Sequence, residues 1–160
     1  MFIVRSYRYV GPPEIREAAR DQPPGQEVRG PEDLAALAGA EGRVLTYVVS
    51  LAGVLRVADR RSEHVACAGG AEVLAAGELE LDAGGEVVGV SNQSTGYCPE
   101  SSCWGALAAA LDAVGVSHPG RFTRAFEFRR CESCGERNLV KDQWFVCSIC
   151  EAELPSAWNF

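Results

Sequence analysis

RVLTYVVSLAGVLRVADRRSEHVACAGGAEVLAAGELELDAGGEVVGVSN, residues 43–92, is the densest region of strand-like patterns in the chain. Its apolar or alternating runs are RVLTYVVS, GVLRVAD, EHVACAG, GELELDA and EVVGVSN. Turn-forming Gly, Ser and Asp residues separate these runs, and the expected turn positions are Gly53, Gly69-Gly70 and Gly84-Gly85. Short strands joined by such turns predict an antiparallel meander.

Helical patterns flank this strand region. Residues 104–114 place apolar side chains at three- and four-residue spacing and follow a capping sequence, Pro99 to Ser102. PEDLAALAG, residues 31–39, opens with proline and acids, and residues 14–20 predict a short helical turn. We therefore expect an α+β fold, mainly antiparallel sheet with one or two packed helices. We also expect strands at 2–10 and 122–130. Residues 21–31 should form a loop, a candidate mobile element, because its prolines keep it out of the sheet.

Two Cys-x-x-Cys pairs, Cys131 with Cys134 and Cys147 with Cys150, lie twelve residues apart near the end of the chain. This is the spacing of a zinc ribbon, in which four thiolates hold one structural zinc ion in a closed tetrahedral site. Disulfides or a redox motif are the alternatives. The opening MFIVRSYRYV does not resemble a signal peptide, which favours zinc and a cytoplasmic location.

The sequence predicts two parts, a body at 1–128 and a ribbon at 129–160. A ribbon of this size buries too little apolar surface to fold alone, so zinc would contribute on the order of 10 kcal/mol to its folding. The strand at 122–130 runs into Cys131 with no flexible linker. We therefore expect the ribbon to be rigidly attached.

Charge and composition disfavour nucleic-acid binding by the body and a membrane partner. The formal net charge is −7, and residues 1–118 already carry 9 basic against 16 acidic side chains. Phosphate repulsion therefore disfavours nucleic-acid binding by the body and leaves the ribbon as the only candidate for it. The apolar stretches are too short for a transmembrane helix, so no membrane partner is expected.

Residues 62–99 carry Ala68-Gly69-Gly70, then Ala75-Ala76-Gly77-Glu78, then the segment Ser94 to Pro99. In this order they resemble a module found in bacterial toxin-associated proteins and in plant IQ-motif calmodulin-binding proteins. The chain departs from that module at Gly96, which stands in place of a histidine. It also contains no basic amphipathic helix of the IQ type. The resemblance implies a fold more than a function.

A polar run from Ser91 to Thr95 precedes the predicted helix at 104–114. It could bind a small anion or a peptide carbonyl, or it could be a loop that caps its own backbone. Cys103 could be a nucleophile with a histidine partner, or a small buried side chain. A second metal site formed by His64, Cys98 and Cys103 is a further alternative. The candidate binding residues are His64, Ser94, Thr95, Tyr97 and Cys103.

The first functional expectation is a zinc-binding protein-interaction or regulatory protein that is not catalytic at the zinc. The alternative is a small enzyme or toxin-related domain with a site near Ser94, Tyr97 and Cys103. Nucleic-acid binding through the ribbon is the third.

Overall fold

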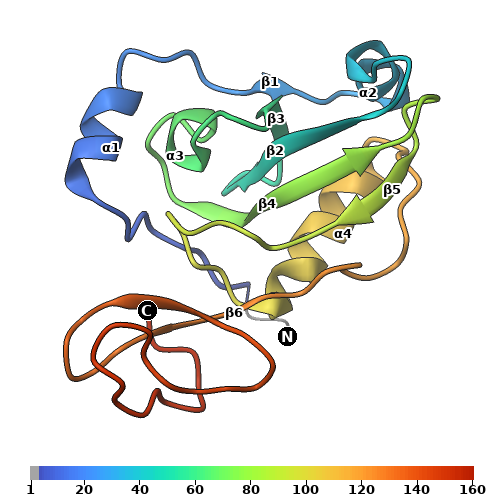
Figure 1. Cartoon of the computed structure of the whole chain (residues 1–160). Helices are drawn as coiled ribbons and strands as arrows, with labels where there is room; N and C mark the ends of the chain where they lie inside the picture. Colours follow the sequence, from blue (N-terminus) through green and yellow to red (C-terminus); the bar gives the residue numbers. More distant parts are fainter. Residues whose placement is uncertain (1–3) are drawn as a thin grey trace.

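A five-stranded antiparallel sheet forms the centre of the molecule (Figure 1). The computed structural model describes residues 4–160. Along the sheet the strands lie in the order β1-β3-β2-β4-β5. Their bounds are Gln26–Glu27 for β1, Arg43–Ser50 for β2, Leu55–Asp59 for β3, Val73–Leu81 for β4 and Val87–Val90 for β5. The predicted α+β class is confirmed.

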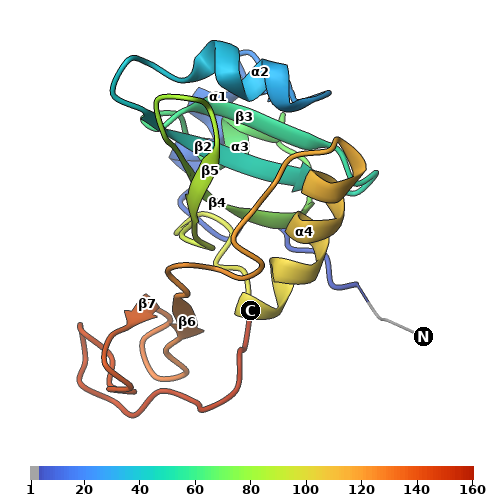
Figure 2. The same ribbon diagram turned by 90° about the vertical axis from the view of Figure 1, so that its right-hand side faces the viewer.

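Within residues 4–160, four short helices surround the sheet. They are α1 (Pro13–Ala19), α2 (Pro31–Leu37), α3 (His64–Cys67) and α4 (Trp104–Ala113), the last preceded by a 3₁₀ turn at Ser101–Cys103. Figure 2 shows α4 lying across one face of the sheet. The helices expected at 14–20, 31–39 and 104–114 are thereby confirmed, although no side chain caps the start of α4.

The core is built around the central strand β2. Tyr47 lies opposite Val57 of β3 and Gly77 of β4, so its large ring is enclosed on both sides. From α4, Leu107 and Leu111 reach the same cluster and are fully buried. β-branched and aromatic residues dominate β2, which suits a strand that has a neighbour on each edge.

The run EHVACAG is not a strand, and the predicted meander is wrong at this point. β4 pairs with the edge of β2 opposite to β3, so the chain must cross from one side of β2 to the other. The crossing contains the single helical turn of α3, which ends at Gly69 and Gly70 with φ of 63° and 82°. β4 then begins at Val73, four residues earlier than GELELDA predicts.

Three other expectations change. Gln26 and Glu27 of the loop at 21–31 pair with Val57 and Arg56 as an edge strand, because the prolines lie outside these two residues. In the predicted strand at 2–10, residues 2 and 3 lie outside the described residues, and Tyr7 forms only an isolated bridge to Val73. The strand expected at 122–130 is shorter, since β6 covers only Glu127–Arg130.

Gly77 is needed where it stands. A Cβ atom at this position would collide with the carbonyl oxygen of Ser91, so only glycine lets β4 pass this close to the end of β5.

The ribbon forms a second, smaller unit of structure below the sheet (Figures 1 and 2). Its two-stranded sheet pairs β6 with β7 (Arg137–Val140). Across residues 4–160, no helix has the length and apolar character needed to cross a membrane.

Candidate metal centre

The four ribbon cysteines bring their sulfur atoms together, all within 4.8 Å of one another. Cys131 Sγ lies 3.5 Å from Cys150 Sγ, and Cys134 Sγ lies 3.6 Å from Cys147 Sγ. All four are free cysteines. Four sulfurs bound to one zinc at about 2.3 Å stand about 3.8 Å apart, so this cluster could coordinate a metal ion with little adjustment.

The two Cys-x-x-Cys turns have the same backbone form. Gly135 follows the first pair with φ of 82°, and its N–H donates to Cys131 O at 2.9 Å. Glu151 follows the second pair with φ of 65°, and its N–H donates to Cys147 O at 3.1 Å. A non-glycine residue is uncommon in this conformation, so the second turn keeps the shape of the first at some cost in strain.

A tight hairpin joins the two turns. After β7, Trp144 N donates to Lys141 O at 2.9 Å, and the two residues between them, Asp142 and Gln143, have φ of 53° and 59°. Positive φ at both central positions is the mark of a type I′ turn, which reverses the chain sharply. The hairpin returns the second cysteine pair to the first.

Asn138 supports the second turn from β7, and the sequence reasoning missed it. Its side chain is buried, accepts the Ser148 N–H at 2.9 Å, and donates to Glu136 O at 3.1 Å. It also donates to Cys147 Sγ at 3.4 Å. An amide placed in this way orients a ligand sulfur and fixes the loop that carries it.

Backbone N–H groups aimed at the sulfurs favour thiolates. The pKa of Cys147 is lowered to about 6, chiefly by the Cys150 N–H. The pKa of Cys131 is also lowered, chiefly by the Cys134 N–H. By contrast, the pKa of Cys134 rises to about 12 despite a backbone hydrogen bond with Glu136, because Cys134 shares protons with the neighbouring sulfurs. The backbone therefore favours the thiolate form of Cys131 and Cys147.

The arginines beside the cysteines bind carbonyl groups. Arg129 is buried and donates from Nε to Pro155 O at 3.0 Å and from Nη2 to Ser156 O at 2.7 Å. Arg130 donates from Nη1 to Gly135 O at 2.9 Å. Both residues therefore fix the ribbon's own backbone, a role that their sequence pattern did not indicate.

The C-terminal tail connects the ribbon to the body. Trp158 donates from Nε1 to Cys98 O at 2.8 Å and packs edge-on against Tyr7, with ring centroids 5.5 Å apart. Arg137, at the start of β7, donates to Thr95 O. Two separate contacts thus join the ribbon to the segment that contains the polar run.

The side chains in and around the polar run form their hydrogen bonds with neighbouring parts of the protein. Ser94 Oγ accepts the Tyr97 N–H at 3.3 Å, and Tyr97 donates from its hydroxyl to Ala71 O at 2.7 Å. Asn92 bonds to the backbone of Phe126 through both its oxygen and its nitrogen. Within residues 4–160, no buried side-chain nitrogen or oxygen lacks a partner.

The other candidate residues contact the backbone or lie buried. His64 Nε2 lies 2.8 Å from Gly77 O, and burial lowers the pKa of His64 to about 4. Cys103 is buried, and desolvation raises its pKa to about 12. Among the described residues, His64, Ser94, Thr95, Tyr97 and Cys103 share no side-chain to side-chain hydrogen bond. Within residues 4–160, only the four ribbon cysteines form a group that could hold a metal.

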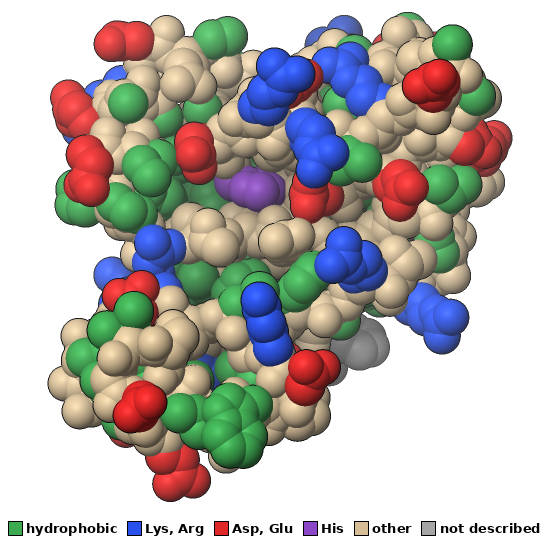
Figure 3. Space-filling view, in the orientation of Figure 1, with side chains coloured by type: hydrophobic (Ala, Val, Ile, Leu, Met, Phe, Trp, Pro, Cys, Tyr) green, Lys and Arg blue, Asp and Glu red, His purple; other side chains and the backbone are tan. Residues whose placement is uncertain are grey.

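Charged side chains of both signs are mixed over the face drawn in Figure 3, on the body and on the ribbon alike. This face therefore presents no continuous basic surface of the kind that tracks a phosphate backbone.

Comparison with protein-family models, with curated proteins and with solved structures finds no match. The resemblance of residues 62–99 to the toxin-associated and IQ-motif module therefore receives no support from these comparisons.

Proposed function

We propose that the chain binds one structural zinc ion through Cys131, Cys134, Cys147 and Cys150, and that the ribbon so formed binds a protein partner. The approach of four free sulfurs to within 4.8 Å supports the metal site. Thiolates at this spacing suit zinc, and four of them fill its tetrahedral shell. No position remains for substrate or water, so the zinc would act in folding rather than in catalysis.

Exposed apolar side chains on the ribbon support the protein-binding role. Trp144, on the hairpin, is 70% exposed, and Ile149, in the second cysteine turn, is 66% exposed. Tryptophan is enriched at protein interfaces, where its large ring is buried against a partner. Both side chains are therefore free to contact a partner.

Charge indicates the chemistry of the partner. The ribbon, residues 129–160, contains five acidic and four basic side chains, or −1. A zinc ion with four thiolates adds a formal −2, giving about −3. The five acids are all exposed, and within residues 4–160 none of them forms an ion pair. They are Glu132, Glu136, Asp142, Glu151 and Glu153. This balance favours a partner with basic residues and disfavours nucleic acid.

The experiment compares partner capture by two variants of the full chain. The double variant Trp144→Ala, Ile149→Ala should lose a partner that the wild-type protein retains at stoichiometric level, while its zinc content stays the same. The control is Val88→Ala, which removes an exposed apolar side chain from the body. Equal capture by the double variant and the wild type would contradict a role for the ribbon surface, and would leave the zinc proposal to its own test.

A further inference from the structure

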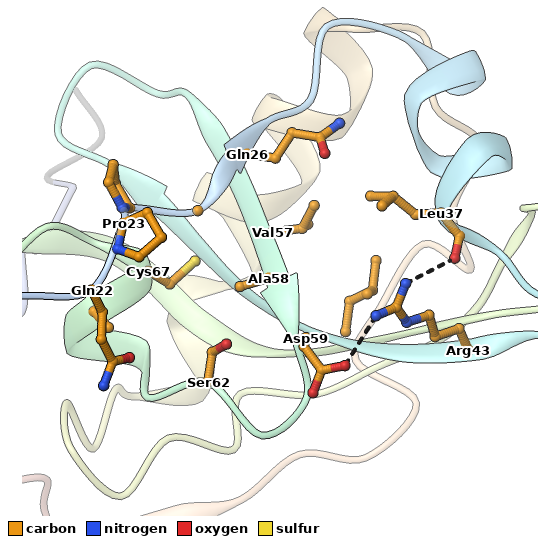
Figure 4. Close-up of a pocket in the computed structure, with 14 residues that line it drawn as sticks. Gln22, Pro23, Gln26, Leu37, Arg43, Val57, Ala58, Asp59, Ser62 and Cys67 are labelled. Atoms are coloured by element: carbon orange, nitrogen blue, oxygen red, sulfur yellow. Dashed lines mark hydrogen bonds and ion pairs between the residues drawn. The ribbon is translucent and has the colours of Figure 1, made fainter. Parts of the chain in front are cut away.

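A pocket of about 320 Å³ opens between the loop that precedes β1, the end of α2 and strands β2 and β3 (Figure 4). Leu37, Leu45 and Val57 provide apolar walls, and the buried thiol of Cys67 lies farther along the pocket. This volume falls at the lower end of the range for small-molecule sites. Nothing in the metal centre uses this part of the body.

One end of the pocket carries two opposite charges. Figure 4 shows Leu37, Val57 and the guanidinium of Arg43 directed toward one another from α2, β3 and β2. Arg43 Nη2 lies 3.0 Å from Asp59 Oδ2, and Arg43 Nη1 donates to Leu37 O at 3.3 Å. A cationic donor and two oxygen acceptors thus meet beside an apolar wall.

This ion pair can open at small cost. The side chains of Arg43 and Asp59 are 39% and 46% exposed, and a pair so exposed contributes little to stability. Asp59 is held separately through Oδ1, which accepts the Arg61 N–H at 2.9 Å. Arg43 is the longer and more flexible partner, so its rotation would separate the charges without moving β3.

We propose that this pocket binds a free α-amino acid with an aliphatic side chain. The ligand carboxylate pairs with the Arg43 guanidinium, which can bind it through two hydrogen bonds. The ammonium takes the place of Arg43 at Asp59 Oδ2 and Leu37 O. The aliphatic side chain lies against Leu37, and Leu45 and Val57, each only 1% exposed, form the floor beneath it. Recognition requires both charges on one carbon, which distinguishes an amino acid from a fatty acid, an amine or a peptide.

Isothermal titration calorimetry of the full-length protein with L-leucine tests this proposal. We expect saturable binding with a dissociation constant of about 1 mM or lower. Isocaproate, which lacks the amine, and isoamylamine, which lacks the carboxylate, should each bind at least about tenfold more weakly, because each loses a charge-assisted hydrogen bond. These two compounds test the site without altering the protein.

Variants locate the binding. Arg43→Gln and Asp59→Asn should each weaken L-leucine binding about tenfold. Arg5→Gln should leave it unchanged, since it breaks an equally exposed ion pair, Arg5 with Glu100, outside this pocket. No saturable binding at about ten times the expected dissociation constant, equal binding of all three compounds, or binding unaffected by both pocket variants would overturn the proposal.

Discussion

At the scale of single residues, Asn138 links one sulfur of the candidate metal centre to the loop that carries it. It is the side chain that contacts a ligand sulfur and also holds the loop between Cys147 and Cys150. Its oxygen accepts both the backbone N–H and the hydroxyl of Ser148, at 2.9 and 3.1 Å. A shorter side chain at this position would leave these donors without a partner.

We therefore expect Asn138→Ala to lower zinc affinity about 10- to 100-fold, the usual effect of removing a group that orients a metal ligand. Competition with a chromophoric chelator measures this change. Ser133→Ala is the matched control, because Ser133 lies exposed in the first cysteine turn and its hydroxyl forms no hydrogen bond within residues 4–160. Equal affinities for the two variants would show that Asn138 does not position Cys147.

The ligand pKa values give a pH dependence with a definite sign. The pKa of Cys147 falls from 9.0 to about 6 in the folded protein. A depressed pKa contributes stability that is present above about pH 9 and is lost as the pH falls through about 6. Because zinc binds the thiolates, protons compete with it, and acidification should weaken zinc binding. A zinc-sensitive dye follows the release, and zinc binding that does not weaken as the pH falls would contradict this order.

Residue-scale prediction worked for the cysteines and failed for their surroundings. The spacing alone predicts that the four cysteines meet, because two short turns can face each other in few ways. The role of Asn138 depends on where β7 places its amide relative to Cys147, and no sequence pattern encodes that placement. His64 shows the same limit, since its bond to Gly77 O joins residues on two different elements.

At the scale of elements, the C-terminal tail is the main attachment of the ribbon. Its Trp158 packs on Tyr7 of the body, bonds to Cys98 O, and lies under the Arg5 guanidinium, 4.6 Å from the ring centroid. The neighbouring Asn159 bonds to the backbone of Arg130 through both its amide atoms. The tail thus contacts the ribbon and the body within two consecutive residues.

Trp158→Ala should destabilise the protein by about 2–3 kcal/mol, because a large, partly buried ring and its hydrogen bond are lost. Trp144→Ala should change the free energy of unfolding by less than about 0.5 kcal/mol, since that ring is mostly in solvent. Urea unfolding of the zinc-loaded protein measures both. A larger loss from Trp144→Ala than from Trp158→Ala would contradict these assignments.

Elements were predictable where local pattern and final environment agree. RVLTYVVS and PEDLAALAG carry strong strand and helix signals, and both formed as expected. EHVACAG reads as an apolar strand, but the crossing over β2 makes it a helical turn. Gln26 and Glu27 show the opposite case, where an edge of β3 recruits residues from a loop rich in proline and glycine. Both outcomes, the helical turn and the edge strand, depend on the order of the strands along the sheet. That order is set by the whole chain and not by a local segment.

At the scale of the whole molecule, the four-cysteine ribbon has a much smaller apolar core than the α+β body. The core of the ribbon consists of Cys131, Val140, Cys147 and Leu154, with Phe145 and Ala152 packed against it. Two of these four buried residues are proposed zinc ligands. So small a cluster does not stabilise a fold without a further contribution, which the metal would provide. The body has its own extensive core and should keep its fold when zinc is removed.

Native mass spectrometry of the purified 160-residue chain shows whether the four cysteines hold zinc. We predict one zinc ion per wild-type chain, with no disulfide, and loss of that zinc in the variant Cys134→Ser, Cys150→Ser. These two cysteines are the exposed members of the cluster, so their replacement perturbs packing least. A wild-type protein that carries no metal and two disulfides, or a variant that retains a full equivalent of zinc, would contradict the account.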